Sequence, residues 1–88
     1  MNRTQALFVA LGWRGGTIHQ VAAETGCEVA DLIYWNSENA VTNRGAAYAC
    51  GYRVSTSGNL QANNPKYRGN LNFWLGVADG IIELNLTK

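Results

Sequence analysis

The chain has 88 residues, of which 47% are hydrophobic and 15% are charged, and its formal net charge is +1. This length suffices for one hydrophobic core but not for two, so we expect a single domain over residues 1–88. The apolar content excludes intrinsic disorder, and the near-neutral charge excludes a global field that would draw the chain onto nucleic acid or an anionic membrane.

The first predicted element covers the apolar run Ala6–Leu11, which is followed by Gly12. Periodicity does not separate a buried helix from a buried strand over so short a run, and we expect a helix. The run is too short for a signal peptide, and no stretch reaches the roughly 20 apolar residues of a membrane span. The two cysteines, Cys27 and Cys50, do not make a disulfide framework. These features predict a cytoplasmic domain without a membrane partner.

A pair of short helices is the best-defined feature of the sequence. Thr17 and Gln20 stand in the order of a capping box, in which each side chain binds the backbone amide of the other residue. The apolar positions of the first helix recur at three- and four-residue steps: Ile18, Val21, Ala22 and Thr25. Gly26 suits the left-handed residue that ends a helix, and a second helix is predicted over Glu28–Asn36.

The middle of the chain is less clearly patterned. Residues 46–54 fit a helix of small residues or a strand, and alternation favours the strand, with one face formed by Tyr48, Cys50, Tyr52 and Val54. The following Ser55–Pro65 stretch is rich in Ser, Gly and Asn, so we expect a loop.

A last helix is predicted after Asn70, which can cap it, although Gly76 and Gly80 weaken the pattern. Ile81–Leu86 could instead end the chain as a short strand. The expected fold class is therefore mainly α, with α+β as the alternative. It is a compact helical domain around the helix pair, with a short β-hairpin or strand pair and a C-terminal helix.

The helix pair resembles the helix-turn-helix of DNA-binding regulators. The matching positions are Ala22, Gly26, Cys27, Leu32 and Trp35. In such a hairpin the small residue lets the helices approach, the glycine makes the turn, and the apolar residues fill the angle between them. The resemblance implies a second helix that reads the major groove.

The chemistry of the second helix does not suit that role. The positions expected to face outward carry no Arg, Lys, Asn or Gln that could reach base edges: Glu28, Val29, Ala30, Ile33 and Tyr34. The segment from Thr17 to Glu38 also contains four acids and no Lys or Arg. Its negative charge would repel phosphate, so DNA docking by this helix is disfavoured.

The same stretch is similar to the LysM glycan-binding module. The matching residues are Gly16, Thr17, Ile18, Val21, Ala22, Gly26, Leu32 and Asn36, and a glycine replaces the Asp of that module's entry motif. This resemblance implies a glycan ligand and a strand, instead of a helix, over residues 6–11.

Basic and aromatic residues gather in the second half of the chain. Charge and base stacking make five of them candidates for nucleic-acid binding: Arg44, Arg53, Lys66, Tyr67 and Arg68. The alternative interpretation of these residues is a solvated loop with core aromatics.

No constellation predicts catalysis, a metal or a cofactor. His19 has no second ligand at metal spacing, and the serines have no base partner. Short chains of this kind resemble accessory proteins of phages and prophages, which implies a modulator or inhibitor that binds a host protein. We assign the partner-binding face to Glu28, Asp31, Ile33 and Tyr34. A DNA regulator and a glycan binder are the alternatives, and a homodimer is compatible with the sequence.

Overall fold

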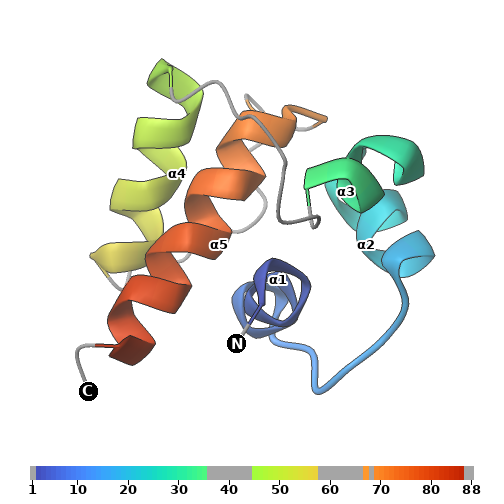
Figure 1. Cartoon of the computed structure of the whole chain (residues 1–88), viewed down its shortest axis with the longest axis horizontal. Coiled ribbons are helices and arrows are strands. Elements are labelled where there is room, and N and C mark those ends of the chain that lie inside the picture. Colours follow the sequence, from blue (N-terminus) through green and yellow to red (C-terminus); the bar gives the residue numbers. More distant parts are fainter. Residues whose placement is uncertain (1, 36–44, 58–66, 68, 87–88) are drawn as a thin grey trace.

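The computed structural model describes residues 2–35, 45–57, 67 and 69–86, which form five helices (Figure 1). The helices are α1 (Arg3–Leu11), α2 (Ile18–Thr25), α3 (Val29–Trp35), α4 (Ala46–Thr56) and α5 (Leu71–Leu86). These residues contain no strand. The mainly α expectation is confirmed, and the β elements predicted within the described ranges are wrong.

The helix α1 begins at a capping box and ends at a left-handed glycine. The Asn2 side chain accepts a hydrogen bond from the Gln5 amide, and the Gln5 side chain accepts one from the Asn2 amide, both at 2.9 Å. Gly12 has a φ of 76°, which glycine adopts without a steric cost. The helix expected over Ala6–Leu11 is confirmed and starts earlier, at Arg3.

The helix α2 has the predicted boundaries. Gln20 donates its amide to the Thr17 hydroxyl at 3.2 Å and accepts the Thr17 amide at 2.8 Å, which completes the capping box. Gly26 ends the helix with a φ of 76° and donates its amide to the Ala22 carbonyl. The second predicted helix is α3, whose described part ends at Trp35.

Thr25 joins the hairpin turn to the segment before α5. It is fully buried, and its hydroxyl donates to the Val21 carbonyl at 2.8 Å and accepts the Cys27 amide at 3.3 Å. Its carbonyl accepts the Gly69 amide at 2.8 Å. A buried polar group with all these partners fixes the turn instead of destabilising it.

The segment predicted as a strand is the helix α4. Alternation along residues 46–54 was a misleading signal, because Tyr48 and Tyr52 are also one helical turn apart. Gly51 and Ser55 are buried and also one turn apart, and they lie against α5. Because a helix brings both residues to the side that contacts α5, this packing favours a helix over a strand. The loop expected over Ser55–Pro65 is wrong for its first two residues, which belong to α4, and residues 58–65 lie outside the described ones.

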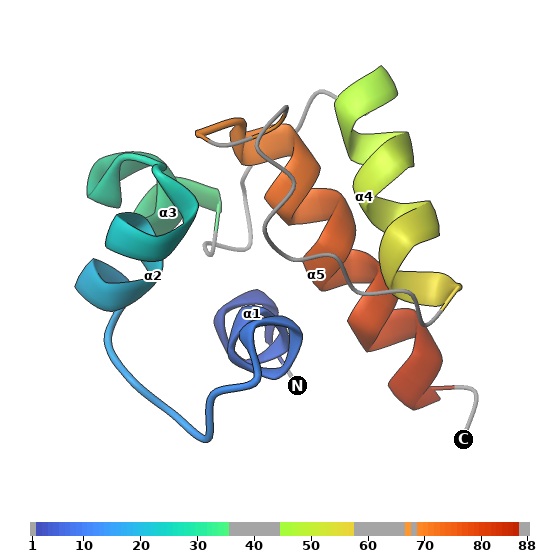
Figure 2. The same ribbon diagram turned by 180° about the vertical axis from the view of Figure 1, so that it is seen from behind.

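The helices α4 and α5 pack in close contact and run in the same direction (Figures 1 and 2). A Cβ atom on Gly76 would overlap the carbonyl oxygen of Tyr48, and one on Gly80 would lie 3.0 Å from that of Tyr52. A Cβ atom on Gly51 would overlap the carbonyl oxygen of Phe73. Glycine on both helices is therefore what lets the two backbones meet.

The helix α5 continues unbroken through its glycines to Leu86. The Asn70 side chain accepts the amides of Asn72 and Phe73 at 3.0 and 3.3 Å, so the predicted cap is confirmed. Gly76 and Gly80 lower the intrinsic helix propensity, but the contact with α4 compensates for it. Residues 81–86 belong to α5, so the terminal strand considered for them is wrong.

A polar cluster joins four of the helices. The Arg3 guanidinium donates to both carboxylate oxygens of Asp79, at 2.9 and 3.3 Å, and to the carbonyl oxygen of Trp35 at 3.0 Å. The Tyr48 hydroxyl donates to Asp79 at 2.7 Å. The helix α1 is seen end-on in Figures 1 and 2 while α5 runs across both views, so the two helices cross steeply. The cluster fixes that crossing.

The buried apolar residues come mainly from α1, the hairpin and α5. The core contains Ala6, Leu7, Ala10, Val21, Ala22, Cys27, Leu32, Trp35, Phe73, Trp74, Leu75, Val77, Ala78 and Ile81. The packing roles predicted for Cys27 and Trp35 are confirmed. Neither Cys27 nor Cys50 forms a disulfide bond in this structure.

We expect Gly76→Ala to lower the free energy of unfolding by about 2 kcal/mol or more, because the added methyl group forces α4 and α5 apart. The same change in an ordinary helix would raise stability by roughly 1 kcal/mol. The matched control is Gly15→Ala, whose Cβ meets no atom within 4 Å. Chemical denaturation measures both, and a more stable Gly76→Ala protein would contradict the close contact.

We expect Asp79→Asn to lower the free energy of unfolding by about 1–3 kcal/mol, since it leaves the Arg3 charge without its counter-charge in a partly buried position. The control is Glu83→Gln, at an exposed position of the same helix, which should change stability by less than about 0.5 kcal/mol. Equal effects of the two substitutions in denaturant titrations would mean that the cluster has no structural role.

Candidate binding surface

All four residues assigned to the partner-binding face are exposed, three of them on α3 and Glu28 directly before it. Ile33 and Tyr34 are 57% and 54% exposed, and both are large apolar side chains. Glu28, just before the helix, and Asp31, in its first turn, are also exposed. We call these four residues the α3 face. They combine adjacent apolar contact area with negative charge.

The α3 face stands on a firmly held helix. Leu32 and Trp35 are each 2% exposed, so the opposite side of α3 is buried in the core. The Arg3 guanidinium holds the last residue of α3, donating to the Trp35 carbonyl and lying 5.7 Å from the centre of its ring. A short helix gains little stability from its own hydrogen bonds, so these tertiary contacts keep it in place.

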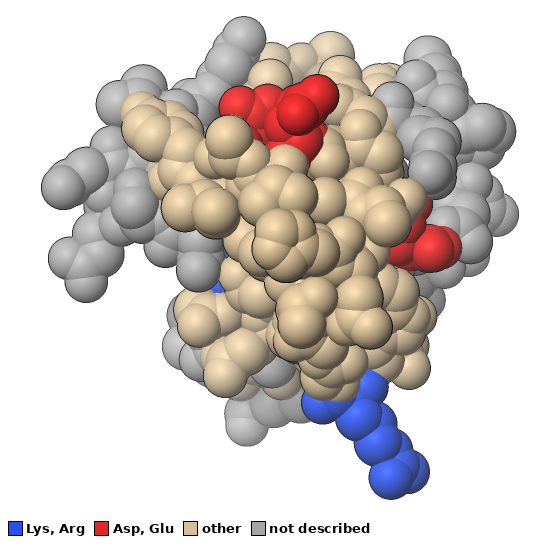
Figure 3. All heavy atoms as spheres, turned by 90° about the vertical axis from the view of Figure 1, so that its right-hand side faces the viewer, with Lys and Arg blue, Asp and Glu red and all other residues tan. Residues whose placement is uncertain are grey.

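The described residues on the side of the molecule formed by α2 and α3 carry little positive charge. Figure 3 faces this side and shows acidic side chains in two groups, a wide uncharged area between them, and basic side chains at the lower edge. Glu24, Glu28 and Asp31 are the acids of the described hairpin, and all three are exposed. This side would therefore favour a partner with apolar and basic groups.

The residues predicted to bind nucleic acid are only partly described. Arg44, Lys66 and Arg68 lie outside the described residues. Arg53 is exposed on α4, which lies across the molecule from the hairpin (Figure 1). Tyr67 is half-buried and its ring stacks on that of Phe73, with centroids 4.9 Å apart and planes 9° apart, so one of its faces serves packing.

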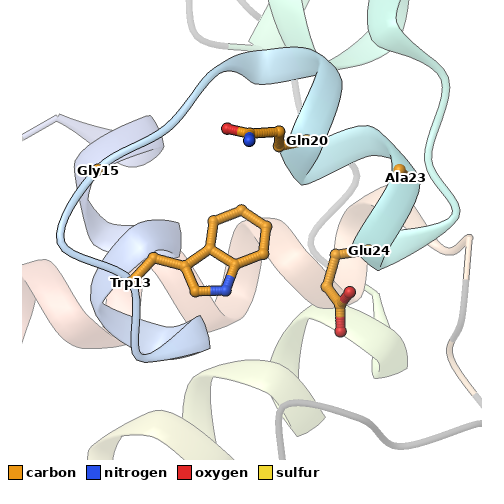
Figure 4. A pocket seen from close by; sticks show the side chains of 5 residues that line it. All are labelled: Trp13, Gly15, Gln20, Ala23 and Glu24. Carbon is orange, nitrogen blue, oxygen red and sulfur yellow. The ribbon is translucent and has the colours of Figure 1, made fainter.

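A pocket that the sequence does not predict lies beside the hairpin. It has a volume of about 480 Å³ and is open to solvent. Figure 4 shows its walls, which are Trp13, Gly15, Gln20, Ala23 and Glu24. The one feature of the sequence that points to the pocket is Trp13, a large aromatic residue next to the hairpin. Trp13 is half-buried, so part of its ring packs against the protein and part is open to solvent.

We expect the double substitution Ile33→Asp and Tyr34→Ala to leave the free energy of unfolding within about 1 kcal/mol of wild type, because both side chains are exposed. Leu32→Ala, on the buried side of the same helix, should lower it by about 2–5 kcal/mol. Thermal and denaturant unfolding followed by circular dichroism test this contrast. Similar losses for the two proteins would mean that the α3 face is part of the core.

Within the described ranges, no group of three or more His, Cys, Asp or Glu residues is placed to hold a metal ion, and His19 is exposed. No described helix has the length and apolar character needed to cross a membrane. Comparison with protein-family models, with curated proteins and with solved structures found no match to this chain. The function of the chain is therefore inferred from its exposed side chains.

Proposed function

We propose that the chain is a non-catalytic recognition module that binds a partner protein through the α3 face. The observation that carries this proposal is the exposure of Ile33 and Tyr34, at 57% and 54%, side by side on a helix whose other side is buried. Contiguous exposed apolar surface bordered by polar residues is a common mark of a protein-binding site. Tyrosine is also among the residues that contribute most to protein interfaces.

The flanking charges indicate the chemistry of the partner. Glu28 and Asp31 border the apolar pair, and the described hairpin has no Lys or Arg to offset them. A complementary partner surface would place an apolar groove between basic side chains. Because α3 is fixed by Leu32 and Trp35, binding needs little ordering of the module, which favours affinity.

The resemblance to phage accessory proteins extends this proposal to a modulator or inhibitor of a host protein. Its support is the α3 face itself, which borders the two most exposed large apolar side chains of the described residues, Ile33 and Tyr34, with acidic groups. A glycan-binding function is not proposed, because residues 3–11 form a helix where the LysM resemblance implies a strand.

The proposal is tested by affinity capture of the partner from host lysate, with and without nuclease. We expect capture to survive nuclease treatment and to fall at least tenfold for the double substitution Ile33→Asp and Tyr34→Ala. Thr56→Ala, at a half-buried position on α4, is a control outside the hairpin and should retain capture. Undiminished capture by the folded double variant would remove the α3 face from the interaction.

A duplex-DNA regulator is the second candidate, because the buried hairpin positions match those of a helix-turn-helix. Ala22, Cys27, Leu32 and Trp35 are all buried as that resemblance requires. The negative charge of the α3 face disfavours DNA binding, because it would repel the phosphate groups. Such a regulator would retard duplex DNA with a steep salt dependence and would lose affinity on Arg53→Glu. Binding that does not depend on salt, or no binding at all, would reject it.

A further inference from the structure

The side of the molecule formed by α2 and α3, which we call the hairpin side, carries opposite charges at its two ends. In Figure 1, α3 lies in the upper part of this side, and the linker between α1 and α2 runs along the bottom. Figure 3 shows acidic side chains at the top of the same side, basic side chains at its lower edge, and uncharged surface between them. A surface polarised in this way can complement a copy of itself.

Arg14 supplies the positive end of the hairpin side. Of the three arginines that the structure describes, Arg3 pairs with Asp79, and Arg53 lies on α4, across the molecule. Arg14 is exposed in the linker, and it forms no ion pair with a described residue. Its neighbour Trp13 is half-buried and is held by a hydrogen bond of 2.8 Å from its amide to the last turns of α1. This end therefore combines a positive charge with a supported aromatic ring.

The negative end of the hairpin side is the α3 face. Glu28 and Asp31 are exposed at the start of the helix, and neither forms an ion pair with a described residue. Ile33 and Tyr34 follow within the next turn and are 57% and 54% exposed. Both ends thus pair charge with apolar contact area, and their charges have opposite signs.

A two-fold axis makes these two ends meet. If the axis lies in the plane of the hairpin side, midway between its ends, the α3 end of one copy faces the linker end of the other. The contact then occurs twice in each dimer, as in any isologous interface. In each contact, Arg14 meets the acids of α3, and Trp13 meets its apolar pair. Tryptophan, tyrosine and arginine are the residues that contribute most to protein interfaces.

We propose that two copies of the chain associate through their hairpin sides into a two-fold dimer, with Arg14 of each copy against Glu28 and Asp31 of the other. The molecule measures 31 × 28 × 27 Å, so one side offers at most roughly the 800 Å² per copy of a standard interface. The dimer is therefore weak and forms as the concentration rises. It covers the α3 face, so a partner protein and a second copy exclude each other. This exclusion, unlike the dimer itself, rests on the function proposed for the α3 face.

Sedimentation velocity of the purified, intact chain tests the dimer directly. Between about 5 µM and about 1 mM, the concentration range of weak complexes, we expect the sedimentation coefficient to rise from that of a monomer to that of a dimer. A roughly tenfold increase in sodium chloride concentration should weaken the association, because the charge pairs lie at the edge of the interface. A monomer over the whole range would overturn the proposal.

A charge reversal with a matched control locates the interface. Arg14→Glu sets like charges against each other at both contacts and should raise the dissociation constant of the dimer about tenfold or more. Arg53→Glu makes the same change of net charge at an exposed position of α4 and should dimerise as wild type does. Equal dimerisation by the two variants would show that the linker end does not take part.

Mixing two charge reversals tests which ends meet. Asp31→Arg alone should also prevent dimerisation, since it sets Arg14 against a second arginine. An equimolar mixture of the Arg14→Glu and Asp31→Arg proteins restores an opposite-charge pair at both contacts, so the mixture should form a heterodimer about as strong as the wild-type dimer. Circular dichroism first confirms that Asp31→Arg is folded, and Glu28→Arg, outside the helix, is the second variant for the same mixture. Failure of both mixtures to associate would overturn the proposed pairing.

The dimer and the function proposed for the α3 face can fail separately. Arg14→Glu leaves the α3 face unaltered, so this monomeric variant should capture the partner protein at least as well as wild type does. Wild-type protein that dimerises but captures no partner would remove the proposed function alone. Wild-type protein that captures its partner but stays monomeric would remove the dimer alone.

Discussion

The close packing of α4 against α5 is the contact on which the rest of the fold depends. At Gly51 and at Gly76, an added Cβ would overlap a backbone atom of the other helix. Because α5 also supplies much of the buried core, its position determines where α1 can cross it and where the hairpin can pack. A larger residue at either glycine would shift α5 and disturb both contacts.

The polar cluster links α5 to the helix that carries the α3 face. Asp79 on α5 holds Arg3 on α1, and Arg3 in turn holds the carbonyl end of α3 at Trp35. The orientation of α3 therefore depends on residues at both ends of the sequence. The same arrangement leaves Ile33 and Tyr34 exposed, since the buried side of α3 is already occupied by the core. A helix supported in this way suits the proposed recognition role, because binding would require little further ordering of it.

The α3 face and the pocket beside the hairpin differ in how far the sequence reveals them. The α3 face could be predicted, because exposure along a helix follows from its own periodicity once Leu32 and Trp35 are placed inward. The pocket could not, since the path between α1 and α2 sets how Trp13 stands relative to Glu24. Of the five residues predicted to bind nucleic acid, the structure describes Arg53 and Tyr67. The ring of Tyr67 stacks on the buried Phe73, so Tyr67 contributes to the packing of the core.

Features that depend on neighbours along the chain could be predicted from the residues alone: the Thr17 capping box, the turn at Gly26, the Asn70 cap, and the exposed acidic and apolar side of α3. Their physical basis is local hydrogen bonding and helical periodicity. Packing between distant helices accounts for the helical state of residues 46–56 and for the glycines Gly76 and Gly80 within α5. It also decided that Arg3 pairs with Asp79, 76 positions away. Such contacts depend on how helices distant in the sequence pack together, and no local pattern specifies that packing.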